Sequence, residues 1–206
     1  MPRLLRLNEV RETAEGEQPP GYALFRKGNL NLGLLSILSL VALPPAFIFF
    51  AFVTGPLGGP FDLQGGEYSF HVDPLDLVLV TIAALVILPI VHELVHGAVA
   101  ALCGGKPVYG IGPGVAFCHF REFVSVGAYA AILIAPLLVL SILGVILMPV
   151  TPGILRGPLL AILITNASGA VGDIASLTQI FGLPRTALIA DTSHGFEVYA
   201  REETGP

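Results

Sequence analysis

Charged residues are scarce in this sequence. Only 12% of its 206 residues are Asp, Glu, Lys or Arg, whereas 54% are hydrophobic, and the mean hydropathy is +0.81. A soluble domain carries about 25% charged residues, so these few charges cannot cover a globule of this size. The same composition excludes a disordered chain. An integral membrane protein surrounded by a lipid bilayer is the class that fits.

Cysteine and positive charge are also in short supply. The two cysteines, Cys103 and Cys118, form neither a disulfide framework nor a C-x-x-C metal knuckle. The net charge is −5 and the isoelectric point is near 5.4, without a basic stripe along the chain. We therefore expect no nucleic-acid partner.

Four stretches reach the roughly 20 apolar residues that a transmembrane helix needs. They are residues 30–53, 75–102, 127–148 and 152–180. The pattern predicts an all-α membrane protein with four transmembrane helices. We expect three parts along the chain, namely a flexible cytoplasmic tail over residues 1–29, the transmembrane domain over 30–180 and a cytoplasmic tail over 181–206.

Two connecting segments have strand-like patterns. The glycine-rich and proline-rich stretch 105–120 predicts a short β-hairpin between the second and third helices, and the C-terminal tail predicts a second hairpin around 191–195.

The orientation in the membrane follows from the basic residues, because cytoplasmic loops are enriched in Lys and Arg. Nine of the ten lie in the tails or in the 103–126 connection, and only Arg156 lies on the other side. Both termini are therefore expected in the cytoplasm.

The second apolar stretch contains an HExxH motif, from His92 to His96. Residues four apart share one face of a helix, so the two imidazoles can hold one Zn²⁺. Glu93 projects about 100° around the helix from His92, where it can take a proton from water and return one to a leaving amine. Placing three ionisable groups within five residues of a lipid-embedded helix costs free energy, and binding a metal in the interior of a helix bundle would offset that cost.

A catalytic zinc site has three protein ligands, so one more residue is required. The candidates are Asp173, His119, Asp191, His194 and His71. Asp173 lies within the fourth apolar stretch, at nearly the depth of His96, and is predicted as the third ligand. His119, Asp191 and His194 would have to fold back from the cytoplasmic side, and His71 is predicted on the opposite side. Asn166 shares a helical face with Asp173 and is a candidate to bind substrate or to link helices.

The run HELVHGAVAALCGGKPVYGIGPG, residues 92–114, resembles the site-2-protease type of intramembrane zinc metalloprotease. The whole layout is more similar to small bacterial membrane proteins grouped as putative zincin peptidases. In site-2 proteases the third ligand is the Asp of an Asp-Gly motif, and by resemblance that role falls on Asp173. Here the order is Gly172-Asp173, and no PDZ-like domain is inserted. The resemblance implies a bacterial cell membrane.

Together these observations predict a membrane-embedded zinc endopeptidase that cleaves membrane-associated proteins. His92, His96 and Asp173 would hold the metal, and Glu93 would be the catalytic base. Gly110 and Gly112 would lie where an unwound substrate adds as a strand. Two alternatives stay open, a metal transporter or sensor without proteolysis, and an inactive membrane scaffold. The substrate and the oligomeric state are not predicted.

Overall fold

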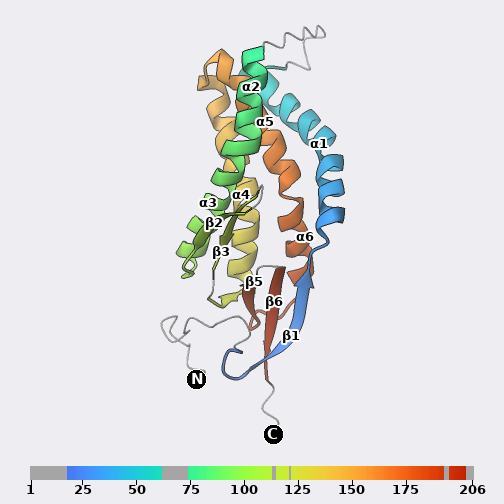
Figure 1. Ribbon diagram of the computed structural model, residues 1–206, viewed down its shortest axis with the longest axis vertical. Helices are drawn as coiled ribbons and strands as arrows, with labels where there is room; N and C mark the ends of the chain where they lie inside the picture. Colours follow the sequence, from blue (N-terminus) through green and yellow to red (C-terminus); the bar gives the residue numbers. More distant parts are fainter. Residues whose placement is uncertain (1–17, 62–73, 113–114, 121, 193–194, 203–206) are drawn as a thin grey trace. The chain divides into compact units, whose positions relative to one another are not determined.

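The computed structural model describes residues 18–61, 74–112, 115–120, 122–192 and 195–202. It is mostly helical and also contains two small sheets (Figure 1). The α-helices are α1 (Leu32–Thr54), α2 (Pro74–Ile82), α3 (Leu88–Leu102), α4 (Val126–Leu147), α5 (Gly153–Gly169) and α6 (Val171–Ile180). Two short 3₁₀ helices, η2 (Gly55–Leu57) and η4 (Met148–Val150), follow α1 and α4, and a π-helical turn, η3 (Ala83–Ile87), joins α2 to α3.

The strands belong to two separate sheets. They are β1 (Tyr22–Asn29), β2 (Val108–Gly112), β3 (Val115–His119), β4 (Val124–Ser125), β5 (Leu188–Thr192) and β6 (Gly195–Arg201). Strands β2 and β3 form a two-stranded hairpin, and the other four form a sheet in the order β1-β6-β5-β4. Every pairing is antiparallel.

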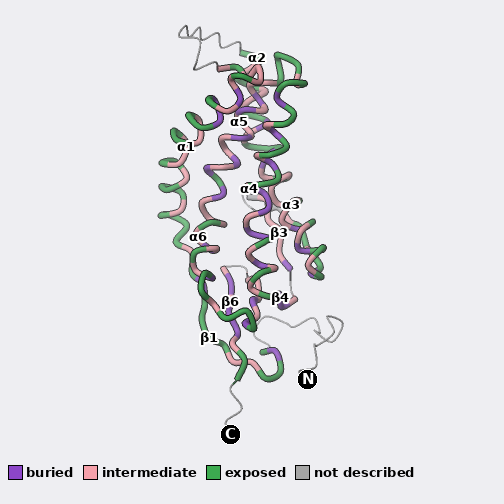
Figure 2. The backbone as a smooth tube through the Cα atoms, turned by 180° about the vertical axis from the view of Figure 1, so that it is seen from behind, coloured by how far each residue is buried: buried purple, intermediate pink, exposed green. Residues whose placement is uncertain are grey.

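The four predicted apolar helices are confirmed. Four helical segments are long and apolar enough to cross a membrane, over Leu32–Leu57, Pro74–Leu102, Val126–Val150 and Gly153–Ile180. Much of α1 is exposed along its length (Figure 2), including the large apolar side chains of Ile37, Leu40 and Ile48. Such surface suits a helix whose neighbours are lipid tails, and this indicates a membrane protein.

Both predicted hairpins are present, but the prediction of an all-α fold with a flexible N-terminal tail needs correction. Residues 22–29 form β1, which pairs with β6 and extends the C-terminal hairpin into a four-stranded sheet. The fourth apolar stretch is also divided, because α5 ends at Gly169 and α6 begins at Val171. Residues 1–17 lie outside the described part of the chain, and the three-part domain division stays a prediction.

The chain groups into two compact units, each with its own apolar core. The first comprises residues 1–30, 94–134 and 173–206, and the second comprises 31–93 and 135–172. The core of the first unit gathers buried side chains from the sheet, the end of α3, the start of α4 and α6, among them Ala100, Ile132, Ile180, Ile189, Phe196 and Val198. The core of the second unit gathers Phe50, Met148, Leu160 and Leu163.

Strand β1 is held to β6 by a cross-strand ion pair and by close packing. Lys27 lies opposite Glu197, with 2.7 Å between Nζ and Oε1, and this contact lowers the pKa of the Glu197 carboxyl. The Tyr199 hydroxyl donates to the other carboxylate oxygen at 2.6 Å. Gly28 is buried, and a Cβ at this position would collide with the ring of Phe196, which is 1% exposed.

We expect Gly28→Ala to destabilise the four-stranded sheet. The Phe196 ring is enclosed in the core and cannot move aside, and such overpacking typically costs about 1–3 kcal/mol. The midpoint of chemical unfolding of the detergent-solubilised protein measures the effect. Gly127→Ala is the matched control, because nothing lies within 4 Å of a Cβ there. Equal stability of the Gly28 variant and the control would contradict this packing account.

Candidate metal centre

Helix α3 presents the two histidines of the HExxH motif one turn apart, on one face. It follows directly from the π-helical turn η3, in which the Leu88 N–H bonds to the Ala83 carbonyl five residues earlier. Pro89 has no N–H to offer the carbonyl four residues before it, so a wider turn at this point fits the sequence. The helix ends just before the Gly104-Gly105 pair, where Gly104 has φ +90° and the Gly105 N–H reaches the Ala100 carbonyl at 2.9 Å.

Asp173 is placed by the break between α5 and α6. Ala170 caps α5, and Asp173 falls in the first turn of α6. A carboxylate is favoured at this position because the N-terminal end of a helix carries partial positive charge. The break therefore gives the chain an acidic side chain inside an apolar stretch at low cost.

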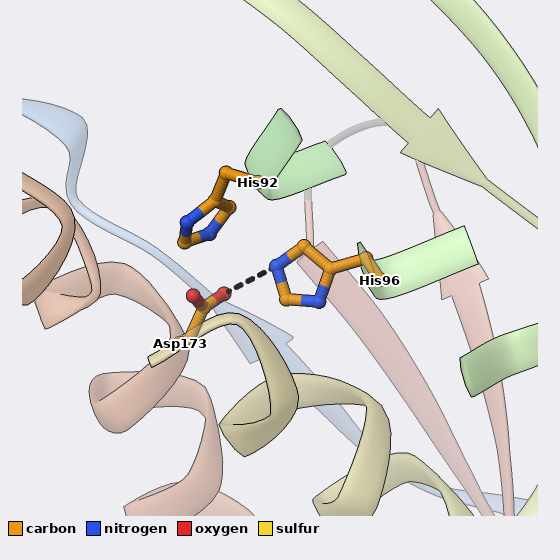
Figure 3. A group of neighbouring side chains, drawn as sticks. All are labelled: His92, His96 and Asp173. Carbon is orange, nitrogen blue, oxygen red and sulfur yellow. Dashed lines mark ion pairs between the residues drawn. The ribbon is translucent and has the colours of Figure 1, made fainter. Parts of the chain in front are cut away.

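His92, His96 and Asp173 lie together in the structure (Figure 3). The Nε2 atom of His96 is 3.4 Å from Oδ1 of Asp173, and the two side chains are only 12% and 20% exposed. His92 precedes His96 by one turn of the same helix. One ligand atom from each of the three residues lies within 4.8 Å of the others. Among the described residues, this is the group of histidine, cysteine and acidic side chains compact enough to hold a metal ion.

Hydrogen bonds hold both imidazoles by the same ring nitrogen. Nδ1 of His92 lies 3.1 Å from Oδ1 of Asn166, and Nδ1 of His96 lies 2.8 Å from the carbonyl oxygen of Ile132. Both partners are acceptors, so each Nδ1 is placed to donate, and a neutral imidazole in this arrangement has its lone pair on Nε2. An outer acceptor on the second ring nitrogen is the usual arrangement for histidines that bind a metal. The two imidazoles and the carboxylate thus fit a zinc ion.

Asn166 is a partner of His92, and its side chain is 1% exposed. Its amide nitrogen donates to the carbonyl of Pro136 at 3.2 Å. Both ends of the amide are therefore engaged within the protein. The structure favours the helix-linking role expected for Asn166, and its role in substrate binding stays a prediction.

Two of the alternative third ligands pair with each other. Nδ1 of His119 lies 3.0 Å from Oδ2 of Asp191, and neither residue belongs to the three-residue cluster. Burial raises the pKa of the Asp191 carboxyl, and the hydrogen bond from His119 opposes that rise. His71 and His194 lie outside the described residues.

The remaining predicted residues lie on or beside α3. Glu93 follows His92 on the helix, and its side chain is partly exposed. Gly110 and Gly112 lie in β2, opposite Phe117 and Val115 of β3.

Two backbone features of the site were not predicted from the sequence. One is the Ile132 carbonyl that holds His96, and the only sequence signal for it is Pro136, four residues further along the helix. The other is the contact between β2 and α3. A Cβ on Gly97 would collide with the Tyr109 hydroxyl, so this glycine lets the hairpin lie directly against the helix, one residue after His96.

Two helix-borne imidazoles and a carboxylate, in a chain with four apolar helices, define a candidate metal centre of the metallohydrolase type. Residues 85–188 match the model of a protein family described as "putative zincin peptidase". The match covers 104 of the 206 residues, so the chain belongs to this family. The family implies a metallopeptidase that uses zinc. Comparisons with curated proteins and with solved structures found no match.

Substitution of the third ligand should separate Asp173 from its alternatives. We expect Asp173→Ala to weaken zinc binding by more than about 100-fold, because outer-shell substitutions alone cost about 10- to 100-fold. His119→Ala and Asp191→Asn are the matched variants and should bind zinc as the wild type does. Competition with a chromogenic chelator on purified protein measures the affinities. A loss at His119 or Asp191 as large as that at Asp173 would reassign the ligand.

Proposed function

We propose that this protein is a membrane-embedded zinc endopeptidase of the site-2-protease type, acting on membrane-associated proteins. The observation that carries the proposal is the cluster of His92, His96 and Asp173 within helices apolar enough to cross a membrane. Ionisable groups at such depth are costly and mark functional sites by default. The family supports peptide hydrolysis as the chemistry, and the apolar helices support a substrate that is itself in the membrane.

His92 and His96 would hold the metal through Nε2, and Asp173 through a carboxylate oxygen. When bound, zinc lowers the pKa of a coordinated water to about 7 and polarises the scissile carbonyl. The hydrogen bonds from Nδ1 to Asn166 and to the Ile132 carbonyl keep both rings in the orientation that this requires. Each ring is thereby fixed before the substrate arrives.

Glu93 would be the general base and then the general acid. It neighbours His92 on α3, so its carboxylate projects beside the two histidines rather than along their face. From there it can accept a proton from the attacking water as the peptide carbonyl is attacked. The same proton then passes to the leaving nitrogen as the peptide bond breaks.

The β2–β3 hairpin would bind the substrate. In the described part of the chain it pairs with no other strand, so its edges carry backbone groups suited to strand addition. The contact between Tyr109 and Gly97 sets β2 against α3 beside His96. A substrate segment added as a strand would be unwound, and its peptide bonds would be exposed to hydrolysis.

The membrane orientation is also a proposal. Nine of the ten Lys and Arg residues lie in the two tails or in the connection between the second and third apolar stretches. By the positive-inside rule both termini would face the cytoplasm of a bacterial cell. The sheet that joins the N-terminal and C-terminal segments would then be cytoplasmic.

The decisive variant for peptidase activity is Glu93→Gln. We expect cleavage of single-span membrane peptides in proteoliposomes to fall by at least about 100-fold, because general acid–base catalysis contributes about 10²–10⁴-fold. Zinc content should stay unchanged, since Glu93 is not a ligand. The control is Glu202→Gln, which removes an exposed carboxylate after β6 and should cleave normally. Mass spectrometry of the products measures cleavage.

Three other outcomes would contradict this proposal in different ways. Unchanged cleavage by the Glu93 variant would exclude the assigned base. A zinc-loaded wild-type protein that cleaves no peptide would favour a metal transporter or sensor. Less than about one zinc per chain after purification would favour an inactive scaffold.

A separate variant tests the hairpin. Proline at both Gly110 and Gly112 removes two backbone N–H groups from β2, so neither its pairing nor strand addition can be complete. We expect cleavage to be lost while zinc stays bound, because the ligands lie on α3 and α6. Cleavage at the wild-type rate would exclude the hairpin as the substrate-binding strand.

A further inference from the structure

Pro136 lies inside α4 and is almost fully buried. Proline has no N–H, so it cannot bond to the carbonyl of Ile132, four residues earlier in the helix. This is the carbonyl that lies 2.8 Å from Nδ1 of His96. The imidazole N–H therefore takes the place of the missing helical donor.

The same proline also reaches the other histidine. The Pro136 carbonyl accepts a hydrogen bond from the Asn166 amide nitrogen at 3.2 Å. Because the amide nitrogen faces Pro136, the amide oxygen of Asn166 faces the opposite way. That oxygen, Oδ1, lies 3.1 Å from Nδ1 of His92. Pro136 thus bears on the partners of both imidazoles. Its missing N–H leaves the Ile132 carbonyl to His96, and its own carbonyl bonds to Asn166, the partner of His92.

We propose that Pro136 is a positioning residue of the metal centre, which sets the Nδ1–H tautomer of both His92 and His96. The missing N–H leaves the Ile132 carbonyl for His96, and the Pro136 carbonyl orients Asn166 for His92. With each proton on Nδ1, each Nε2 keeps the lone pair that a metal needs. The inference rests on the proposed metal site and not on peptide hydrolysis.

If Pro136 only shaped the helix, no histidine would need to bond to the carbonyl four residues before it. Helix α1 also contains two prolines, Pro44 and Pro45, both exposed. Neither carbonyl four residues before them has a hydrogen bond from a histidine among the described residues. What sets Pro136 apart is that the carbonyl four residues before it lies 2.8 Å from an imidazole nitrogen.

Alanine at this position would supply the N–H that proline lacks. The Ile132 carbonyl would then accept the regular helical bond, which competes with His96 for the same oxygen. The variant is expected to fold, because alanine is the better helix residue. Pro136→Gly supplies the same N–H without a side chain, so agreement between the two variants excludes an effect of the alanine methyl group.

The test uses the full-length protein labelled with ¹⁵N-histidine, kept zinc-free, and examined by NMR for the protonated nitrogen of each ring. We expect His96 to lose its uniform Nδ1–H form in Pro136→Ala and in Pro136→Gly. Zinc affinity, measured by chelator competition, should fall by about 10- to 100-fold in both. Pro45→Ala is the matched control and should change neither measurement.

Asn166→Ala gives the complementary pattern. It removes the acceptor of His92, so His92 should lose the Nδ1–H form while His96 keeps it. Unchanged His96 tautomer and unchanged zinc affinity in both Pro136 variants would overturn the inference. A wild-type protein that binds no zinc would overturn the proposed function instead. The tautomer comparison is made without metal and would still decide the role of Pro136.

Discussion

The constraint on which this structure depends is that polar groups inside apolar helices must find partners within the protein. Lipid tails cannot replace a missing hydrogen bond, and an unpaired polar group costs several kcal/mol. The two histidines of α3 meet this requirement with a backbone carbonyl and an amide, and His96 also faces Asp173. The hydrogen bonds that make the cluster tolerable in an apolar setting are the same ones that direct its ligand atoms to one place.

The four-stranded sheet contributes to the site through the core beneath it. Ala100 lies one turn after His96, Ile132 provides the carbonyl that His96 bonds, and Ile180 ends the helix that begins near Asp173. All three belong to one buried cluster with Ile189, Phe196 and Val198 of the sheet. Packing at native density resists small displacements, so the sheet fixes the three elements that carry this half of the site. Strand β1 pairs with β6 and so belongs to the sheet that packs on this core.

The sequence was enough to predict the apolar helices and the HExxH face, because each depends on local spacing. It also predicted the cluster with Asp173, because that residue lies at nearly the depth of His96 along its own apolar stretch. The strand over residues 22–29 was missed because its partner lies at residues 195–201, and its adjacent Arg26 and Lys27 have no apolar alternation. The carbonyl of Ile132 was missed for another reason. A backbone acceptor has no residue type to identify it, and only the proline four positions later marks it.

Irregular backbone occurs near every residue of the cluster. It makes backbone groups available to side chains of neighbouring helices. Pro89 and η3 precede His92 on α3, Pro136 follows Ile132 on α4, and the α5–α6 break precedes Asp173. A regular helix in an apolar setting uses all its own carbonyls and N–H groups and offers none to a neighbour. His96 uses such an acceptor, the Ile132 carbonyl ahead of Pro136, whereas His92 uses the side chain of Asn166. Helix α1 shows that prolines alone do not make a site, because in the described part of the chain no histidine bonds to the carbonyls four residues before Pro44 and Pro45.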